Sequence, residues 1–469
     1  MSSRDDVVVV GAGPAGMAAA ARLRSMAIRV TLVDEQPAPG GQIWRNLEAN
    51  RNTAVGKALG SDYAAGAAAV AALRGSGCSL RFGTQVWQLE DGQSDADWRV
   101  FLKTAEGLDM LPASIVLLAG GAQERPNPFP GWTLPGVVSV GAAQILMKSA
   151  GQIPAEPVWV AGAGPLPLLY MTQLLALGGK IAGYLDTTPR GNLVAALPHL
   201  PRALAAWRDL RKGIGWLKVL RRSAVPIVKD VAEIAASGSD CLETVTYRPR
   251  GGAAVTVPAR LLLVHEGVVP AIHVTMAMGC RHDWRDDQQC FAPSLDGWGE
   301  TSRAGLYVAG DGAGIGGAEA ARLRGEIAAL GIARKLGKLS EAEAGQRAAP
   351  FRRALKKALA PRPFLDALYR PRPEIFAPAG HTVVCRCEEV TADQICRAAG
   401  KGGPNQLKAF TRAGMGPCQG RQCGYTVSHL LARSLNSSPG EVGFFHIRPP
   451  LKPVTLGELA TLEVEEATP

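Results

Sequence analysis

Two segments of the chain repeat the same order of apolar run, glycine turn and helical stretch. Residues 7–10 are all valine and lead directly into Gly11-Ala-Gly13-Pro14-Ala15-Gly16, and residues 17–26 follow with helical composition. Further along, residues 158–161 lead into Gly162-Ala-Gly164-Pro-Leu-Pro167. Short apolar runs that end at a glycine turn and open a helix are typical of parallel strands in α/β folds. The pattern predicts an α/β protein with two nucleotide-binding-type units.

The first glycine turn has the residues that a dinucleotide site needs. Gly11 permits a tight turn, Gly13 lets the backbone approach a pyrophosphate, and Gly16 lets the helix pack closely on the strand. Free N–H groups and the helix dipole favour phosphate at the start of such a helix. A second predicted strand, residues 28–33, ends at Asp34, and an acid about 20 residues past the glycines can hold a ribose hydroxyl. We therefore predict a dinucleotide with an unphosphorylated adenosine ribose; the alternative is a turn without a ligand.

The second turn departs from this pattern at its third glycine, which is Pro167. Proline lacks the N–H that would face a phosphate, and its ring stands where close helix–strand packing wants no side chain. Leu185 and Asp186 stand near the expected acidic position and leave the matter open. Residues 157–179 carry no charge, but their glycines and prolines predict strand, turn and helix, not a membrane span. We expect the fold to persist with an altered or vestigial pocket; a retained NAD(P) site is the alternative.

Composition supports a folded, modular protein. The 469 residues are 47% apolar and 20% charged, with a formal net charge of +10, and this length favours about three domains. Basic residues are densest at 202–222 and 352–372 with few interleaved aromatics, so we expect solvated helix faces and no nucleic-acid binding. Because residues 7–10 already belong to the first strand, no room is left for a signal peptide. We expect a cytoplasmic protein.

Nine cysteines is an odd number for a chain of this kind, so a disulfide framework is not expected. Cys78, Cys241, Cys280 and Cys290 lack Cys-x-x-Cys spacing, and we predict that they are small buried residues. A disulfide reductase needs a thiol pair beside its redox cofactor. None of the first four cysteines meets that need, so such an activity is disfavoured.

The remaining cysteines cluster near the C-terminus. Residues 346–380 are basic and proline-rich and predict a helix and a stiff linker, after which a new domain starts near His381. Cys385-Arg-Cys387 and, further on, Cys418 and Cys423 could hold a metal. Structural zinc usually has two to four residues within each cysteine pair, and four thiolates also hold an iron–sulfur cluster. The spacing of the first pair favours iron–sulfur, while Cys396, on a predicted helix 392–399, is expected in the core.

Three further segments carry a resemblance: Gly40-Gly41-Gln42, residues 117–121 and residues 306–312. With them the chain resembles flavoproteins with two dinucleotide-binding domains, the superfamily of glutathione and thioredoxin reductases, although Gly120 stands where that family has threonine. The resemblance implies a discontinuous FAD domain (1–125 and 269–345), a second NAD(P)-binding-like domain (126–268), the linker 346–380, a cysteine domain (381–440) and a tail (441–469). The residues that it implies at FAD are Gly11, Gly13, Pro14, Ala15, Gly16, Asp34, Glu35, Gly40, Gly41, Gln42, Ala119, Gly120, Gly121, Gly310, Asp311, Gly317 and Ala318.

The cysteine domain resembles the bacterioferritin-associated-ferredoxin-like 2Fe-2S domain, which implies Cys385, Cys387, Cys418 and Cys423 as ligands. With residues 405–412 and 448–458, nearly the whole chain resembles the alpha subunits of heteromeric amino-acid dehydrogenases, a family with opine oxidases, D-hydroxyproline dehydrogenases and hydrogen cyanide synthase. The resemblance implies an electron-transfer subunit with FAD and a 2Fe-2S cluster, a second flavin, FMN, between subunits, and a small helical C-terminal domain.

The same family resemblance implies partners. A separate flavoprotein beta subunit of the D-amino-acid oxidase type would oxidise the secondary amine or amino acid, a small third subunit would join the complex, and a quinone or dye would accept the electrons. The chain would then work in the cytoplasm or peripherally at the inner membrane face. Two alternatives stay open: an NAD(P)H-dependent reductase that passes electrons through FAD and cluster, and a regulatory module with zinc at the cysteines. No catalytic residue is identified; His265, beside Glu266, is expected to be structural.

Overall fold

The computed structural model describes residues 5–92, 97–204 and 207–462. Its first unit is a sheet in the order β3-β2-β1-β6-β5-β4, with β19 also paired to β6. The strands nearest the first glycine turn are parallel, and an antiparallel pair, β4 and β5, extends the sheet beyond β6. The strands of this sheet are β1 (Asp5–Val10), β2 (Val30–Asp34), β3 (Ser79–Phe82), β4 (Gln85–Asp91), β5 (Trp98–Lys103), β6 (Leu108–Leu118) and β19 (Leu306–Val308).

Helices cover the first sheet. Two of them, α1 and α12, pack so closely that a side chain at Gly325 would stand 2.2 Å from the carbonyl oxygen of Ala15. The valines of β1 and the alanines of both helices are buried in one core. The helices of this part are α1 (Pro14–Arg24), α2 (Leu47–Asn50), α3 (Ala54–Leu59), α4 (Ser61–Ala64), α5 (Gly66–Arg74), α12 (Ala318–Lys335) and α13 (Glu341–Ala358).

The second unit is a parallel sheet in the order β11-β10-β9-β15-β8, followed by an antiparallel sheet, β12-β13-β14. Residues 157–179 form β9 and α7 on either side of a glycine turn, which confirms the prediction for that segment. The elements are β8 (Val137–Ser139), α6 (Val140–Ala150), β9 (Val158–Ala163), α7 (Pro165–Ala176), β10 (Ile181–Asp186), β11 (Ile227–Lys229), β12 (Val231–Ser237), β13 (Thr244–Pro249), β14 (Val255–Pro258) and β15 (Leu262–Glu266).

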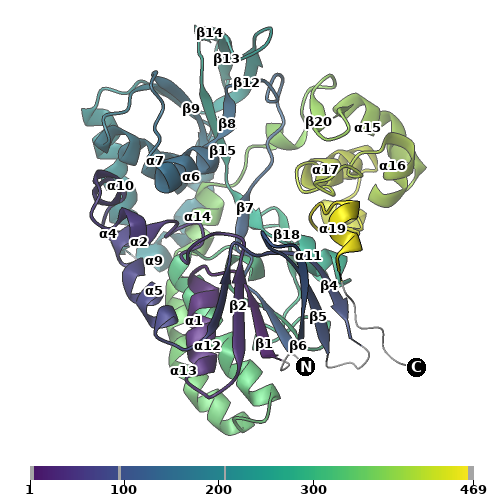
Figure 1. The fold of residues 1–469 in the computed structure, drawn as a ribbon. Coiled ribbons are helices and arrows are strands. Elements are labelled where there is room, and N and C mark those ends of the chain that lie inside the picture. Colours follow the sequence, from purple (N-terminus) through teal and green to yellow (C-terminus); the bar gives the residue numbers. More distant parts are fainter. Residues whose placement is uncertain (1–4, 93–96, 205–206, 463–469) are drawn as a thin grey trace.

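Two short strands join the units. β7 (Ala122–Glu124) leads out of the first unit, and β16 (Val268–Pro270) returns to it, paired antiparallel with β7. In Figure 1 this ribbon lies between the first sheet below and the second sheet above. After the return come α11 (His273–Ala277), β17 (His282–Arg285), β18 (Cys290–Pro293) and η3 (Gly310–Ala313). The chain is thus the predicted α/β fold with two nucleotide-binding-type units.

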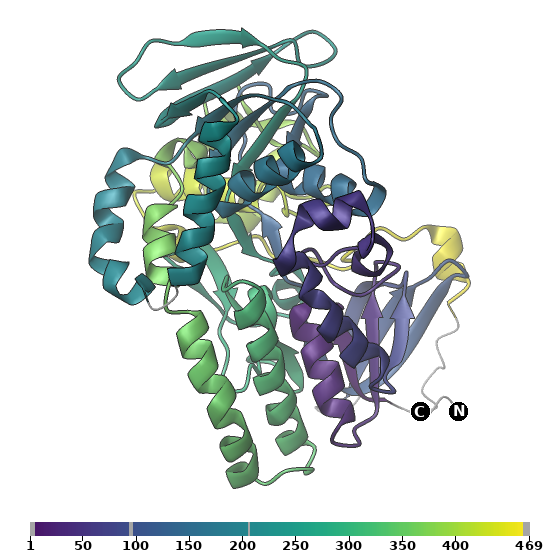
Figure 2. The ribbon, with the colours of Figure 1, turned by 90° about the vertical axis from the view of Figure 1, so that its left-hand side faces the viewer.

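A helical segment is inserted between β10 and β11. It comprises α8 (Arg190–Ala196), η1 (Leu197–His199), α9 (Leu200–Ala203) and α10 (Trp207–Arg222). Its inner side packs on α14 (Arg362–Leu368) through a small core of Ala196, Ala203 and Phe364. Figure 2 shows these helices on the side of the molecule that is the left-hand edge of Figure 1. The segment 346–380 is therefore partly helical: residues 346–358 belong to α13 of the first unit, and α14 packs against the inserted helices of the second unit.

The C-terminal domain is small and mostly helical. Its core joins Cys385, Cys423 and Phe445 to Val269 and Phe291 of the first unit, so the domain is docked on that unit. Figure 1 shows it on the side opposite α10. Its elements are η4 (Pro373–Phe376), β20 (Val383–Cys385), β21 (Val390–Thr391), α15 (Ala392–Ala398), η5 (Ala399–Lys401), α16 (Pro404–Thr411), α17 (Gly424–Ser434), α18 (Pro439–Val442) and α19 (Leu456–Ala460).

Two expectations for cysteines need correction. Cys396 lies on α15 as predicted, but its side chain is exposed and not in the core. Ile395 takes the buried position of that helix turn. Cys280 and Cys290 are buried as predicted, whereas Cys78 and Cys241 are only partly so. Among the helices that the structure describes, none is both long and apolar enough to cross a membrane.

Candidate functional site

The first glycine turn is built so that no side chain fits at two of its positions. Gly11 has φ +107°, and a Cβ there would stand 2.6 Å from the carbonyl oxygen of Ala119. A Cβ at Gly16 would stand 1.8 Å from the carbonyl oxygen of Gly11. Pro14 occupies the first turn of α1, where its missing N–H costs nothing, and the N–H groups of Ala15 and Gly16 follow. The turn brings these groups close to the backbone of residue 119.

The acid at the end of β2 faces this turn. The Asp34 carboxylate accepts hydrogen bonds from the backbone N–H of Ala12 (2.5 Å) and of Gln36 (2.7 Å). Burial raises the pKa of this carboxyl group. The next residue, Glu35, forms an ion pair with Lys452 from the tail (3.1 Å). Burial alone would raise the pKa of Glu35, but Lys452 holds it below its usual value.

The double-glycine loop lies directly against the turn. The backbone N–H of Gly40 donates to the carbonyl of Ala12 (2.9 Å), and a Cβ at Gly41 would stand 2.8 Å from the Cα of Gly13. The loop is held from outside by Lys148 of α6, whose ammonium group donates to the carbonyls of Gln42 (2.9 Å) and Ile43 (3.1 Å). Burial lowers the pKa of Lys148 to about 8. Sequence reasoning missed this lysine because nothing local in a helix marks it.

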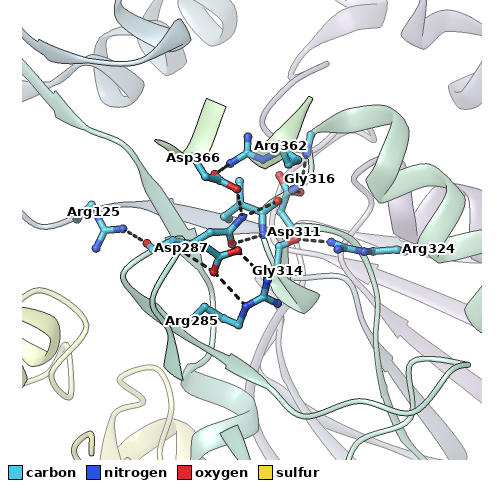
Figure 3. Close-up of polar contacts among 12 residues, drawn as sticks. Arg125, Arg285, Asp287, Asp311, Gly314, Gly316, Arg324, Arg362 and Asp366 are labelled. Atoms are coloured by element: carbon cyan, nitrogen blue, oxygen red, sulfur yellow. Dashed lines mark hydrogen bonds and ion pairs between the residues drawn. The ribbon is translucent and has the colours of Figure 1, made fainter. Parts of the chain in front are cut away.

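Gly310 and Asp311 approach the same turn from the far end of the sequence. A Cβ at Gly310 would stand 3.0 Å from the side chain of Ala15. The Asp311 carboxylate accepts hydrogen bonds from the backbone N–H of Gly316 (2.9 Å) and of Gly317 (3.0 Å), and Figure 3 shows it pointing into this loop. Asp311 therefore fixes the entry to α12, whose first residue is Ala318.

A polar network steadies the loop that carries Asp311. Arg324 of α12 donates to the carbonyls of Gly310 (3.0 Å) and Gly314. Gln288 exchanges hydrogen bonds with the backbone of Ile315 and also donates to Asp366 of α14 (3.3 Å). Figure 3 shows Arg324 approaching this loop from one side and Asp366 of α14 lying on another. Sequence patterns gave no signal for Arg324 or Gln288, since their partners are backbone carbonyls of a loop.

The fold thus brings four of the sequence-predicted segments together: residues 11–16, 40–42, 119–121 and 310–318. Gly312 completes the group, because a Cβ there would stand 3.5 Å from the carbonyl of Gly121. All four lie at the carboxyl ends of parallel strands or directly after them, which is where ligands bind in open α/β sheets. Free N–H groups at the start of α1, beside the hydrogen-bonded carboxylate of Asp34, suit a dinucleotide with an unphosphorylated ribose.

The second glycine turn also joins a strand to a helix, but its conformation and chemistry differ: Gly164, which precedes α7, has φ +108°, whereas Gly13, which precedes α1, has φ −77°. Gly162 lies so close to β15 that a Cβ would stand 1.9 Å from the carbonyl oxygen of His265. Pro165 and Pro167 both fall in the first turn of α7, and Pro167 is buried. His265 is buried as well, and its Nδ1 lies 2.7 Å from a Glu124 carboxylate oxygen, which is the structural role expected for it. The turn keeps the fold but offers fewer N–H groups than the first.

The four predicted ligand cysteines gather in the C-terminal domain. Cys385 ends β20, Cys387 follows it, Cys418 lies in the glycine-rich loop, and Cys423 directly precedes α17. The Gly414 N–H points at the Cys385 sulfur (3.5 Å). The Cys385 thiol is hydrogen-bonded to Cys423, which lowers the pKa of Cys385 to about 6.

The cysteines form two pairs. Cys385 lies against Cys423 and Cys387 against Cys418, and Cys423 is also close enough to Cys387 and Cys418 for their charges to raise its pKa. Within the described part of the chain, no three His, Cys, Asp or Glu side chains are grouped closely enough to hold one metal ion. Glycine is required in the loop, because a Cβ at Gly416 would stand 2.3 Å from the Cβ of Cys387.

The loop between Cys418 and Cys423 rests on the first unit. Gln123, which follows closely after Gly121, donates from Nε2 to the carbonyl of Arg421 (3.2 Å). Arg421 is also one of the charges that lower the pKa of Glu35. The cysteine loop is therefore a direct neighbour of the strand that leaves the first glycine site.

Comparison with known proteins places this fold in a family. The model of the pyridine nucleotide-disulphide oxidoreductases matches residues 5–325, and the model of the sarcosine oxidase A3 domain matches residues 379–462. The chain belongs to the pyridine nucleotide-disulphide oxidoreductase family, and FAD is the cofactor that this membership supports.

Relatives cover nearly the whole chain. The A subunit of opine oxidase from Rhizobium meliloti (strain 1021) is 44% identical over 97% of this chain and 98% of its own length. The corresponding opine oxidase subunit of Agrobacterium tumefaciens (strain Ach5) is also 44% identical, over 97% of this chain and 92% of its own. Hydrogen cyanide synthase subunit HcnB of Pseudomonas protegens is 34% identical over 95% of this chain and 96% of its own. The chain is a homologue of these oxidoreductase subunits.

Solved structures agree on the fold. L-proline dehydrogenase from P. horikoshii superposes with a TM-score of 0.71 at 20% identity, over 97% of this chain and 79% of that one. Thioredoxin reductase of Lactococcus lactis gives a TM-score of 0.52 at 16% identity, over 72% of this chain and 100% of that one. The thioredoxin reductase covers 72% of this chain and has no counterpart for the rest. These likenesses confirm the predicted fold class.

Proposed function

We propose that this chain is the electron-transfer subunit of a heteromeric dehydrogenase that oxidises a secondary amine or amino acid such as an opine, proline or D-hydroxyproline. The single observation that carries the proposal is the contact between the two predicted redox sites. Gln123, beside the first glycine site, is hydrogen-bonded to Arg421 in the cysteine loop, and the cysteine domain shares a hydrophobic core with the first unit. An electron that leaves the first site therefore has a packed route to the cysteines within one chain.

FAD fits the first site on the residues present. The N–H groups of Ala15 and Gly16 are free for the pyrophosphate, and Asp34 and Glu35 stand at the ribose end. When bound, a flavin supplies a group that accepts two electrons and releases them singly. The Asp311 loop, held by Arg324, and the N-terminus of α12 would flank the ring end, where a helix dipole favours negative charge. We propose the full set of residues given above for FAD as the binding site.

A 2Fe-2S cluster fits the cysteines better than zinc does. Structural zinc usually has two to four residues within each cysteine pair, whereas Cys385 and Cys387 have one residue between them. Within the described residues, no group of three or more ligands is close enough to hold one metal ion. In a 2Fe-2S cluster the four cysteine thiolates bind as two pairs, one pair on each iron. Backbone N–H groups such as that of Gly414 would stabilise sulfur charge. Cys385, Cys387, Cys418 and Cys423 are the proposed ligands, and residues 381–440 are the part of the domain that carries them.

The relatives support a division of the reaction between separate subunits. Those with high identity are themselves subunits, of opine oxidase and of hydrogen cyanide synthase. We propose that a flavoprotein beta subunit of the D-amino-acid oxidase type carries out the oxidation, that FMN lies between subunits, and that a small third subunit completes the complex. The electron acceptor would be a quinone or a dye.

The second unit is proposed to have lost NAD(P) binding in the usual pose. Two of the first three residues of α7 are prolines, and Pro167 is buried where a glycine would let a nucleotide approach. An NAD(P)H-dependent reductase would need that site. Mixing the protein anaerobically with NADH and with NADPH separates the two functions: slow or absent flavin bleaching supports the subunit role, and rapid bleaching supports the reductase.

The test of the main proposal uses the purified full chain. We expect bound flavin and about two irons per chain, with little oxidation of opines or proline by the chain alone. Coexpression with the proposed beta subunit should restore oxidation with a dye as acceptor. Efficient amine oxidation by the isolated chain, or stoichiometric zinc in place of iron, would contradict it.

A further inference from the structure

The helical segment inserted in the second unit has an outer face that nothing in the described part of the chain covers. Almost half of the exposed large apolar side chains in the described residues lie between residues 193 and 219. On α8 and η1 they are Leu193, Val194 and Leu197; on α10 they include Trp207 and Ile214. Val194 is 68% exposed, Trp207 52% and Ile214 55%. Clustered exposure of this kind marks an interaction site more often than single exposed residues do.

These residues are not an unfinished core, because the inner side of the same helices is already packed. Ala196 and Ala203 are fully buried against Phe364 of α14. On α10, Leu220 is fully buried, and Leu217 packs on the main core. The exposed positions Trp207, Arg211, Ile214 and Lys218 of α10 follow the period of one helix face. α10 therefore packs on the rest of the protein with one side and exposes a second, apolar side.

The second face is strongly basic. Exposed Arg202, Arg211, Lys218, Arg221 and Arg222 lie in the segment, whose sequence has Asp209 as its only acid between residues 190 and 222. Within the described residues, Arg211, Lys218 and Arg221 have no acidic partner. The Arg211 guanidinium stacks over the Trp207 ring, 5.6 Å from its centre. Cations thus alternate with apolar side chains on the same surface.

We propose that this outer face, formed by residues 190–204 and 207–222, binds the surface of an anionic lipid bilayer. A basic helix with exposed Trp and aliphatic residues can bury its apolar side chains at the headgroup boundary while its arginines and lysines meet lipid phosphates. A protein partner fits less well, because cations alternate with the apolar side chains across this face, whereas the core of a protein interface is depleted of charged residues. A second copy of this chain would bring two like-charged faces together, which is repulsive.

The position of the face agrees with a tethering role. In Figure 1 α10 and the cysteine domain lie on opposite sides of the molecule, and Figure 2 shows the helical segment toward the viewer with the cysteine domain behind. Binding through α8 and α10 would leave the cysteine loop and the first glycine site free to meet other subunits. The inference does not depend on which substrate the complex oxidises.

Vesicle cosedimentation of the purified full chain tests the proposal. We expect binding to phosphatidylcholine vesicles that contain phosphatidylglycerol, and little binding to phosphatidylcholine alone. Reversing two charges, Arg211→Glu with Lys218→Glu, should weaken binding to the anionic vesicles by about tenfold or more. The matched control, Arg353→Glu with Lys356→Glu, makes the same charge change at exposed positions of α13 and should weaken it less than about threefold.

A second pair of variants separates apolar insertion from charge attraction. Trp207→Ala with Ile214→Ala keeps the charge and should also lose about tenfold, whereas Leu146→Ala with Leu456→Ala, at exposed positions elsewhere, should not. Melting temperature and flavin content establish that each variant is folded. Equal losses in test and control pairs, or no vesicle binding by the unmodified chain, would overturn the proposal. So would a change in oligomeric state, or loss of a copurifying subunit, with vesicle binding intact.

Discussion

The two glycine turns of this chain both join a strand to a helix, but they differ in conformation and in their fitness to bind a ligand. The glycine before the helix has φ −77° in the first turn (Gly13) and +108° in the second (Gly164). In the first turn, only Pro14 among the first three residues of α1 lacks an N–H; in the second, both Pro165 and Pro167 of α7 do. A Cβ at Gly16 would meet a carbonyl at 1.8 Å, while the equivalent position of the second turn is a buried proline ring. A helix can therefore pack on its strand even where the turn between them lacks the features that bind phosphate.

The two acids at the ends of the second strands differ as well. Asp34 accepts hydrogen bonds from the turn itself, at the Ala12 N–H, and from Gln36. Asp186 accepts one from Thr188 (3.0 Å), two residues on in its own loop. Burial raises the pKa of both carboxyl groups. Only the first acid is connected to its glycine turn, which is a further reason to place the dinucleotide there.

The largest expected effect comes from filling the first turn. Gly16→Ala puts a methyl group against the carbonyl of Gly11, and the turn must open to admit it. We expect flavin content to fall by about tenfold or more, since backbone strain of about 1–3 kcal/mol corresponds to that range of binding. Flavin absorbance per chain measures it. Gly345→Ala, on α13 with open space around it, is the control, and a similar loss there would remove the argument.

Lys148 offers a pH test of the coupling between the second unit and the first site. Its pKa is lowered by burial from 10.5 to about 8, so the folded state binds fewer protons than the unfolded state between those pH values. Stability therefore rises with pH across that window, by about 3 kcal/mol at most for this group. Compared with Lys148→Met, the unmodified chain should gain free energy of unfolding as pH rises from 8 to 10.5.

Denaturant melts at several pH values measure this difference, because other groups cancel between the two proteins. Lys57→Met, which removes an exposed lysine away from the double-glycine loop, serves as control. Lys148→Met should also loosen flavin by several-fold at neutral pH, since the carbonyls of Gln42 and Ile43 lose their donor. A pH profile identical in all three proteins would show that Lys148 is not held as described.

Restoring the second turn should have a smaller effect. Pro167→Gly returns one N–H to the start of α7 and removes the ring, and we expect NADH or NADPH to bind severalfold more tightly than to the unmodified chain. Intrinsic fluorescence titration gives the dissociation constants. If the unmodified chain already binds either nucleotide tightly and its flavin is bleached by it, the contrast between the turns is wrong.

The smallest effect is expected at the tail. Lys452→Met removes the ion pair with Glu35 at the ribose end of the first site, and flavin should be released about two- to threefold faster, as suits a half-exposed pair. Glu458→Gln breaks another tail ion pair, with Lys103, away from the site. Equal effects of the two changes would mean that Lys452 only holds the tail.

The sequence predicted those features that depend on residues close together in the chain. The valine run, the glycine turns, the helix at 392–399 and the broken apolar stretch 157–179 all follow from residues a few positions apart. Lys148 reaches Gln42 across 106 positions of sequence, and Arg324 acts on carbonyls of a loop, so neither left a local signal. The exposure of Cys396 depends on how α15 is rotated on its neighbours, and composition does not set that rotation.

The cysteine domain shows the same limit. Spacing alone marked Cys385, Cys387, Cys418 and Cys423, and the fold places them in two hydrogen-bonded pairs. Residues after 440 were expected to form a tail, yet Phe444 and Phe445 pack in the core of the cysteine domain. The sequence did not predict that the Phe445 ring lies against Gly414 and Gly420, because these residues meet only when the loop is folded.

The most direct test of the account is electron paramagnetic resonance of the anaerobically purified chain after reduction with dithionite. The account predicts a signal from a reduced two-iron cluster, alongside visible absorbance of bound flavin, with the iron signal lost in Cys418→Ser and kept in Cys396→Ser. A chain that binds flavin but contains zinc, or whose iron signal survives Cys418→Ser unchanged, would contradict it.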